Sequence, residues 1–292
     1  MSAEPGRPSA RIAIFQMTSG IDPQANADAL VAAIGEAKAG GAAMLFTPEM
    51  SGLIDRNRAR AALHIVPEDA DPVLLAVRAA AARAGIWVSI GSLAVARADG
   101  RWANRAFVID GDGEIAARYD KIHMFDVDLA NGESWRESSA YVGGDAVVTV
   151  DTPVGLLGLT ICYDLRFPAL FEALGRAGCD VIAIPAAFTL PTGEAHWHIL
   201  QRARAIEASA YVVAAAQAGK HDDGRSTYGH SLVVDPWGDV ILDMGEAGNS
   251  GGQVGFCDID AQRIIDVRRQ LPSLANKRAL PTGGKFLDRF VS

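Results

Sequence analysis

Short apolar runs alternate with helical patterns from the start of the chain. The run Arg11–Met17 predicts a strand, and the segment Asn26–Ala39 places apolar residues at helical spacing before a stop at Gly40. The pattern then repeats with strands at Ala43–Phe46, Ile86–Ile90, Ala106–Ile109 and Glu114–Arg118, and with a helix at Pro72–Ala84. The first half therefore has an α/β pattern.

The second half repeats this pattern. Strands are predicted at Val147–Val150, Leu156–Ile161, Val181–Ile184, Tyr211–Ala216, His230–Val234, Val240–Met244 and Gly255–Ile259, with helices at Pro168–Ala177, His196–Ala208 and Ile264–Leu271. No linker rich in Pro, Ser or charge separates the halves. We therefore expect one layered α/β domain over residues 11–278, with a flexible N-terminal segment 1–10 and a C-terminal tail 279–292.

Charge and composition narrow the function classes. The 292 residues carry 27 Lys and Arg against 35 Asp and Glu, a net charge of −8. No cluster of basic residues is available to neutralise a phosphate backbone or an anionic bilayer, which argues against nucleic-acid and membrane partners. The three cysteines are an odd number without metal or redox spacing, and no signal peptide is recognised, so we expect a cytoplasmic protein.

Three polar residues follow predicted strands, where α/β sheets present catalytic groups. Cys162 follows Leu156–Ile161, and a thiol at such a turn lies near backbone N–H groups that favour the thiolate; alternatively it is a small buried hydrophobe. Glu49 follows Ala43–Phe46, and a partly buried acid there has a raised pKa suited to a general base, unless it is a solvated loop acid.

Lys121 follows the strand Glu114–Arg118. It could stabilise an oxyanion, or it could form a surface ion pair with Asp120. Histidines leave a Cys-His dyad open, the candidates being His123, His196, His198 and His230. His196 and His198 alone make a poor metal chelate, because residues two apart splay on a helix. No nucleotide-binding motif is present, and we expect no metal and no cofactor.

Taken together, FTPEM around Glu49, YDKIHMFDVD around Lys121 and LTICYDLRFP around Cys162 resemble the nitrilase superfamily of carbon-nitrogen hydrolases. The similarity runs from about Arg11 to Arg278 and includes the segments Gly193–Gln217 and Tyr228–Val240. It is greatest to the deaminated glutathione amidase branch, with omega-amidases close behind. The resemblance implies a four-layer α-β-β-α sandwich, and a homodimer or higher homo-oligomer.

The resemblance also implies a mechanism. Glu49 takes the proton of Cys162, the thiolate attacks an amide carbonyl, and Lys121 with the backbone N–H of Tyr163 holds the oxyanion. A thioester forms, ammonia leaves, and water releases a carboxylic acid. A second glutamate, assigned to Glu137 by its motif in preference to Glu133, orients the lysine and the substrate.

The substrate class depends on residues beside the nucleophile. Arg166 could pair with a substrate carboxylate or with Asp164, and Phe188, Thr189 and His196 could line the pocket. The sequence departs from the branch at Glu194 and His198, where relatives usually carry Pro and Glu. The leading hypothesis is an amidase for a carboxylate-bearing small amide such as deaminated glutathione.

Alternative functions remain open at this point. One is an omega-amidase acting on alpha-keto acid omega-amides, and another is a different amidase or nitrilase of the superfamily. From other classes come a non-catalytic protein that keeps the fold and a redox sensor that pairs Cys162 with Cys179. The joint presence of Glu49, Lys121, Cys162 and Glu137 argues against the non-catalytic protein.

Overall fold

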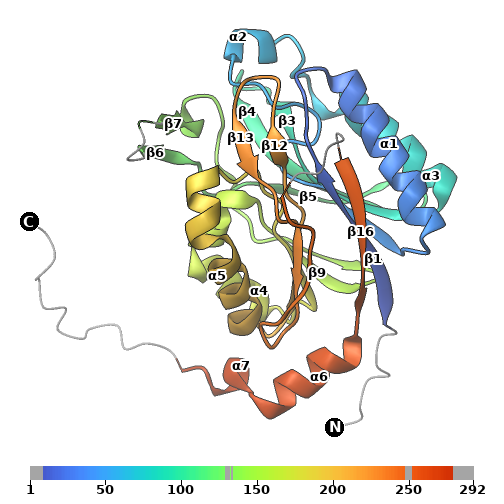
Figure 1. The fold of residues 1–292 in the computed structure, drawn as a ribbon, viewed down its shortest axis with the longest axis vertical. Coiled ribbons are helices and arrows are strands. Elements are labelled where there is room, and N and C mark those ends of the chain that lie inside the picture. The colour runs from blue at the N-terminus through green and yellow to red at the C-terminus, as the bar shows by residue number, and fades with distance from the viewer. Residues whose placement is uncertain (1–8, 129–131, 133, 247–251, 279–292) are drawn as a thin grey trace, which may run out of the picture.

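A computed structural model describes residues 9–128, 132, 134–246 and 252–278, and Figure 1 traces the chain through two six-stranded sheets. Most of residues 1–10, all of 279–292 and Glu133 lie outside the described part. The first sheet has the order β16 (Gly252–Ile259), β1 (Ala10–Met17), β2 (Met44–Phe46), β3 (Trp87–Ala96), β4 (Trp102–Ile109) and β5 (Ile115–Asp120). The second has the order β15 (Val240–Asp243), β14 (Leu232–Val234), β11 (Tyr211–Ala214), β10 (Val181–Ala183), β9 (Gly155–Leu159) and β8 (Thr149–Thr152).

Each sheet has a parallel centre and antiparallel edges. Strands β1, β2 and β3 are parallel in the first sheet, as are β9, β10 and β11 in the second, and the outer pairs are antiparallel. The central strands are short, apolar and buried, as expected for strands covered on both faces.

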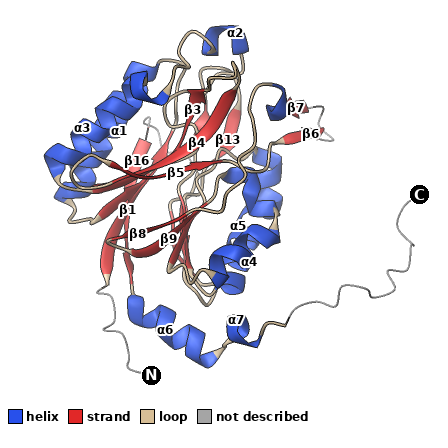
Figure 2. Ribbon diagram, turned by 180° about the vertical axis from the view of Figure 1, so that it is seen from behind, coloured by secondary structure: helices blue, strands red, loops and turns tan. Residues whose placement is uncertain are grey.

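The two sheets pack face to face, and a layer of helices covers each outer face (Figure 2). Helices α1 (Pro23–Ala39) and α3 (Pro72–Ala84) cover the first sheet, and α4 (Pro168–Arg176) and α5 (Leu190–Ala208) cover the second. Alternation along β1 explains the layering: Ile12 and Ile14 join the core between the sheets, whereas Ala13 and Phe15 join the core under α1 and α3. The expected four-layer α-β-β-α sandwich is confirmed.

Helix boundaries follow local chemistry. Asp71 caps α3 by accepting a hydrogen bond from the backbone N–H of Leu74 at 2.9 Å, Pro72 occupies the first turn, and Gly85 ends the helix in the left-handed region with φ 60°. Helix α5 begins at Leu190, six residues before the predicted start at His196, because Pro191 is compatible with a first turn. No helix of the described chain is long and apolar enough to cross a membrane.

Several short elements were not predicted from the sequence. They are the helices α2 (Arg58–Ala61) and α7 (Ser273–Asn276) and the hairpins β6–β7 (Asp126–Asp128, Ser134–Arg136) and β12–β13 (Ala218–Lys220, Ser226–Tyr228). Three short 3₁₀ segments occur at Glu68–Ala70, Glu137–Ser139 and Cys162–Arg166. The predicted helix near Ile264 is α6 (Ala261–Gln270).

An irregularity in β3 sets the position of the loop that carries Glu49. The pairing of β3 with β4 shifts register between Ile90 and Leu93. Within this bulge the Gly91 N–H donates to the Thr47 hydroxyl at 3.1 Å, and Ser92 Oγ accepts from the Met50 N–H at 2.9 Å. The bulge therefore holds residues on both sides of Glu49.

We expect Gly91→Ala to destabilise the fold by about 1–3 kcal/mol through overpacking. A Cβ at this buried position would lie 2.2 Å from the Thr47 carbonyl oxygen and 2.4 Å from that of Pro48, so backbone must move. Gly35→Ala is the matched control, because a Cβ there meets nothing within 4 Å and a helix interior favours Ala over Gly by about 0.5–1 kcal/mol. Urea unfolding measures both changes, and an equally stable Gly91→Ala protein would contradict this view of the bulge.

Candidate active site

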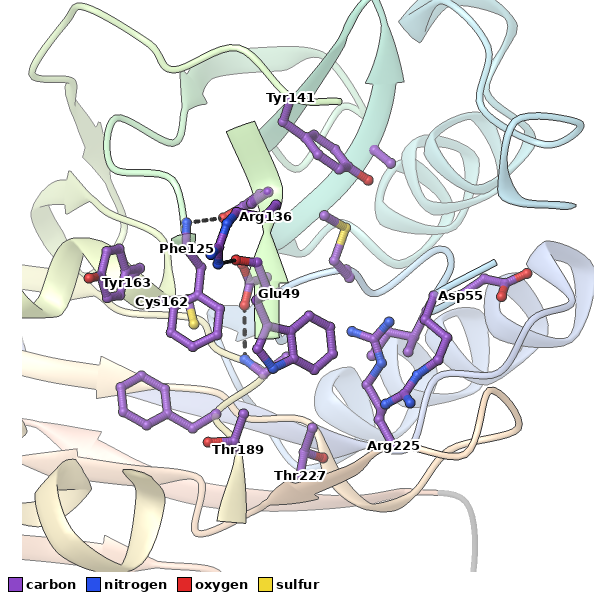
Figure 3. Close-up of a pocket in the computed structure, with 18 of the residues that line it drawn as sticks. Glu49, Asp55, Phe125, Arg136, Tyr141, Cys162, Tyr163, Thr189, Arg225 and Thr227 are labelled. Carbon is purple, nitrogen blue, oxygen red and sulfur yellow. Dashed lines mark hydrogen bonds between the residues drawn. The ribbon is translucent and has the colours of Figure 1, made fainter. Parts of the chain in front are cut away.

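The structure brings Glu49, Lys121, Cys162 and Glu137 together at one end of the two sheets. Glu49 follows β2 and Lys121 follows β5, both in the first sheet. Cys162 begins a 3₁₀ turn after β9 of the second sheet, and Glu137 begins another after β7. Figure 3 shows the Glu49 carboxylate directed toward the Cys162 side of the pocket. Four segments far apart in the sequence therefore contribute to one site.

Lys121 is the centre of this cluster. Its Nζ donates to Glu49 Oε1 at 2.9 Å, and to Glu137 Oε2 and Oε1 at 2.9 and 3.1 Å. The lysine is only 2% exposed, and Glu49 is 5% exposed. With both carboxylates ionised and the lysine protonated, the three groups carry a net charge of −1. Buried ionised groups are tolerated when they are paired and hydrogen-bonded in this way.

Backbone donors hold the two carboxylates. The Ala187 N–H donates to Glu49 Oε2 at 3.0 Å, and the Phe125 N–H donates to Glu137 Oε2 at 2.7 Å. In Glu49 one oxygen faces Lys121 and the other is fixed by the main chain, whereas Glu137 Oε2 accepts from both Lys121 and the Phe125 N–H. This arrangement leaves the carboxylates little freedom to rotate.

Asn104 is a member of the site that sequence reasoning missed. Its Nδ2 donates to Glu49 Oε1 and to Glu137 Oε1, each at 3.0 Å, so one amide bridges both carboxylates. Its Oδ1 is buried with no hydrogen-bond partner among the described residues. Asn104 lies inside β4 and not after a strand. A search for polar residues at strand ends therefore misses Asn104. An amide within an apolar strand is nevertheless a signal of a buried polar contact.

Cys162 is held in an uncommon backbone conformation. Its φ is 49°, in the left-handed region that few non-glycine residues adopt, and its N–H donates to the Pro185 carbonyl at 2.8 Å. Such strain is typical of functional sites. The N–H of the next residue, Tyr163, has no hydrogen-bond acceptor within the described chain, and it is free to bind a ligand oxygen.

The charges of the site differ from two expectations drawn from the sequence. Burial alone would raise the pKa of Glu49, but the Lys121 ammonium and hydrogen bonds from Cys162, Lys121 and Asn104 outweigh burial and lower it. Burial, reinforced by the Glu49 carboxylate, raises the pKa of Cys162 well above its usual value, although Lys121 opposes this. The expected raised pKa of the acid and the expected thiolate were therefore both wrong. The resting pair is a carboxylate beside a neutral thiol.

Lys121 remains charged in spite of its burial. Desolvation lowers its pKa, but Glu137 and Glu49 reverse that effect and raise the pKa well above the usual value. The alternative role as a partner of Asp120 does not fit, since Asp120 receives hydrogen bonds from Arg105 at 2.6 and 2.9 Å. A buried, permanently cationic lysine beside a thiol provides fixed positive charge for a developing anion.

The histidines are engaged with groups other than Cys162. His123 Nδ1 lies 2.7 Å from Asp164 Oδ1, and His196 Nδ1 lies 3.3 Å from Arg166 Nη1. His198 and His230 both contact Asp243. The group placed to accept the thiol proton is Glu49, so the geometry does not favour the Cys-His alternative.

Cys162 and Cys179 are both free thiols. Cys179 is fully buried, beneath β9, where its sulfur would lie 3.0 Å from a Cβ at Gly158. Nothing in this arrangement offers Cys179 as a resolving thiol for a redox sensor.

A cavity of about 980 Å³ opens above the cluster, and Glu49, Lys121, Glu137 and Cys162 all line it. Its aromatic wall includes Trp135, whose ring lies under two guanidinium groups, with Arg225 Cζ 4.9 Å and Arg56 Cζ 5.6 Å from the centroid. Five arginines line the cavity: Arg56, Arg58, Arg136, Arg166 and Arg225. A cavity of this size and charge suits a small anionic organic molecule.

Arg166 is the arginine nearest the nucleophile in sequence. Its guanidinium lies 5.5 Å from the Phe188 ring centroid and 5.9 Å from that of Tyr163. The alternative partner Asp164 is buried and accepts hydrogen bonds from the Tyr119 hydroxyl and the Ile161 N–H, at 2.6 and 2.9 Å. No acid in the described chain pairs with Arg166 or with Arg58. Arg58 Nη2 donates to the Arg136 carbonyl at 2.7 Å and Arg166 Nη1 lies 3.3 Å from His196 Nδ1, so each guanidinium keeps other N–H groups for an anion.

The other candidate binding residues are distributed as follows. Tyr163, Phe188 and Thr189 line the cavity, whereas His196 does not line it and contacts Arg166 instead. Arg58, Trp135 and Arg225 line the cavity but were not identified from the sequence. They lie on α2, β7 and the turn before β13, the short elements that the hydrophobic pattern did not reveal.

We expect Glu49→Gln to make the Cys162 thiol more acidic. The neutral amide removes an anion that raises the thiol pKa, while Lys121 remains. Iodoacetamide modification of Cys162, followed by mass spectrometry across pH, should show its midpoint at a lower pH than in the wild type. Glu207→Gln is the matched control, on α5 and paired with Arg204. An unchanged or higher midpoint in Glu49→Gln would refute this account of the charges.

Comparison with known proteins agrees with this geometry. The carbon-nitrogen hydrolase family matches residues 11–269. The deaminated glutathione amidase of Yersinia enterocolitica is 39% identical over 275 residues, which cover 92% of this chain and 93% of that protein. The crystal structure of the C. elegans NitFhit protein superimposes with a TM-score of 0.85 at 36% identity, covering 94% of this chain and 66% of that longer chain.

A second similar structure has a modified cysteine. It is a Glu-to-Gln variant of an amidase from Nesterenkonia sp. AN1, showing the result of Michael addition of acrylamide at its active-site cysteine. The TM-score is 0.74 at 26% identity, with 90% of this chain and 98% of that chain covered. The chain belongs to the carbon-nitrogen hydrolase family of the nitrilase superfamily, whose members hydrolyse carbon–nitrogen bonds other than peptide bonds.

Proposed function

We propose that this protein is an amidase for small carboxylate-bearing amides such as deaminated glutathione, and that it acts through a thioester on Cys162. The observation that carries the proposal is the buried Glu49–Lys121–Glu137 cluster beside the Cys162 thiol, at the base of an arginine-lined cavity. The relatives named deaminated glutathione amidase support the substrate class.

In the first half-reaction, Glu49 accepts the Cys162 proton as the sulfur attacks the amide carbonyl. The carbonyl oxygen becomes an oxyanion that is stabilised by Lys121 Nζ and by the unpaired N–H of Tyr163. The proton held by Glu49 then passes to the amide nitrogen, the carbon–nitrogen bond breaks, and a thioester remains. Because the Cys162 thiol is neutral at rest, it loses its proton only as its sulfur attacks the carbonyl of a bound substrate.

In the second half-reaction, Glu49 accepts a proton from water, whose oxygen attacks the thioester carbonyl. The carbon–sulfur bond breaks, a carboxylic acid is released, and the proton returns to sulfur. The leaving group is ammonia only when the substrate is a primary amide. The amide of deaminated glutathione is secondary, so its hydrolysis releases an amine, which corrects the expectation of ammonia for that substrate. Glu137 and Asn104 position Lys121 and Glu49.

The arginines support an anionic substrate. Arg166 stacks near Phe188 beside the nucleophile, and Arg58 lies on the α2 side of the cavity, so one carboxylate could bind at each. A molecule with a carboxylate at both ends, such as a deaminated tripeptide, matches two separate cationic groups. An alpha-keto acid omega-amide, the second candidate, has one carboxylate and needs only one of them.

We further propose that the protein works in the cytoplasm as a homodimer. Free thiols at all three cysteines fit a reducing compartment. Exposed large apolar side chains on α5 and the β14–β15 hairpin support self-association; they are Ile199, Ile206, Trp237, Val240 and Ile241.

Replacement of the nucleophile tests the mechanism. We expect Cys162→Ala to lower kcat by about 10⁴-fold or more for every amide substrate, because no other group can form the thioester. Circular dichroism should be unchanged, since the substitution removes one sulfur atom and no charge. Product acid and amine are quantified by chromatography, and an acyl adduct on Cys162 is sought by mass spectrometry after acid quench. Turnover within tenfold of wild type would exclude this mechanism.

Replacement of Arg166 tests the substrate class. We expect Arg166→Met to raise KM for deaminated glutathione by about 10-fold or more, the loss expected for a charged hydrogen bond, and to change KM for a neutral aliphatic amide much less. Methionine keeps the apolar contact with Phe188, so packing is preserved. Arg176→Met on α4, an exposed member of an ion pair with Glu172, is the control. Equal changes for charged and neutral amides would rule out a carboxylate clamp at Arg166.

A further inference from the structure

A second cluster of ligating side chains lies apart from the cysteine site. His198 comes from α5, His230 precedes β14, and Asp243 ends β15. One ligating atom from each residue lies within 4.8 Å of the others. His198 is also one of the two positions at which the sequence departs from the branch that it resembles. The proposed amidase chemistry uses none of these three side chains.

The geometry of the cluster converges on one carboxylate. His198 Nε2 lies 2.9 Å from Asp243 Oδ2, and His230 Nδ1 lies 3.0 Å from Asp243 Oδ1. The two imidazole rings are 5.2 Å apart, centroid to centroid, at 76°. All three side chains are partly accessible, so an ion can reach them from solvent. Two imidazole nitrogens and one carboxylate oxygen form a common donor set for divalent transition metals.

Surrounding groups fix the imidazole of His230. Its ring stacks on Tyr228 with centroids 4.5 Å apart and planes at 20°. Its backbone has φ 54°, in the left-handed region, and its N–H donates to the Gly245 carbonyl at 2.7 Å. The Gly245 N–H in turn donates to Asp243 Oδ1 at 2.9 Å. His230 and Asp243 are therefore positioned before any ion binds. Metal ligands are commonly oriented in this way by hydrogen bonds from neighbouring groups.

The local charge favours a cation. Glu194 lies one helical turn before His198 on α5, which places both on one side of the helix. Glu194 is the second position at which the sequence departs from its branch. A cation at the His198–His230–Asp243 cluster would therefore meet the Asp243 carboxylate, and Glu194 lies on the same side of α5 as His198.

We propose that His198, His230 and Asp243 bind a divalent transition-metal ion of the zinc class, with water completing the coordination shell. When the metal binds, it takes the place of the proton on the ring nitrogen of each histidine that faces Asp243. That proton moves to the other nitrogen of the same ring. This second nitrogen has no hydrogen-bond acceptor within the described chain. This proposal does not rest on the amidase mechanism.

Such an ion would join α5 to the β14–β15 hairpin. The first turn of α5, at Leu190 and Thr192, and Thr227 of β13 line the cavity above Cys162. The neighbouring residue Tyr228 packs against His198 and His230. The metal would therefore act as a clamp behind one wall of the cavity and would not take part in the chemistry.

Zinc titration tests the proposal in a Cys162→Ala background, since the thiol beside Glu49 is itself a possible zinc ligand. Calorimetry on the metal-stripped full chain should give one site per chain, with a Kd in the micromolar range or tighter. His198→Gln keeps a hydrogen-bonding partner for Asp243, and Asp243→Asn keeps the shape of the side chain. Each substitution should weaken zinc binding by about 10-fold to 100-fold. His64→Gln, at an exposed histidine after α2, is the matched control and should bind zinc as the parent does.

Cobalt provides an independent measurement. Co²⁺ in a site of two imidazoles and a carboxylate should give visible absorption bands that zinc displaces and that His198→Gln lacks. Thermal denaturation should show a zinc-dependent rise in Tm for the parent and the His64→Gln control only. No zinc binding tighter than about 100 µM, or equal binding in the parent and in both site variants, would overturn the proposal and leave a hydrogen-bonded surface triad. Neither result bears on turnover of amides by the wild-type chain.

Discussion

The burial of one lysine between two glutamates is the constraint on which the site depends. Lys121 cannot remain charged in the interior without Glu49 and Glu137, and neither carboxylate could remain ionised without it. Loss of one member of a buried ion pair typically costs about 3–5 kcal/mol, so the three groups must be held together by the fold. Close packing of the chain around Lys121 does this: the Gly144 N–H donates to the Lys121 carbonyl at 2.8 Å, and a Cβ at Gly144 would lie 2.3 Å from the Asp120 carbonyl oxygen. The cluster is thus built into the edge of the first sheet.

The net negative charge of that cluster has a chemical consequence. Burial is the larger effect, and the Glu49 carboxylate reinforces it: together they raise the pKa of Cys162 and keep its sulfur protonated at rest. A neutral thiol is a poorer target for oxidants and other electrophiles than a thiolate. The carboxylate that raises the thiol pKa is also the base that we propose to remove its proton. Glu49 therefore suppresses unproductive reactions of the sulfur and promotes the productive one, and Lys121 supplies positive charge only where the carbonyl oxygen becomes anionic.

The sequence predicted the parts of the structure that repeat. Strands with buried faces and helices with caps have a period, and the candidates Glu49, Lys121 and Cys162 could be found because each follows such a strand. Asn104 could not be found in this way, since it lies within β4, and Arg58 and Trp135 lie on elements of three or four residues, too short to show a period. The pKa directions of Glu49 and Cys162 were wrong for a related reason. They depend on which charges meet across the fold, and a local sequence contains no information on that arrangement.

Helix α5 connects the two clusters described above. Residues two apart on a helix point about 200° apart, and His196 and His198 accordingly reach different partners. His196 contacts Arg166 at the cavity, whereas His198 contacts Asp243 on the hairpin side. Their spacing predicts that His196 and His198 cannot chelate one metal together, and the geometry is consistent with that. The spacing does not exclude a site in which one of them is joined by ligands from other strands. His230 and Asp243 lie 32 and 45 positions further along the chain, and only the antiparallel pairing of β14 with β15 brings them to His198. The same helix therefore contacts Arg166, the arginine proposed to bind the substrate, and carries one ligand of the proposed metal clamp.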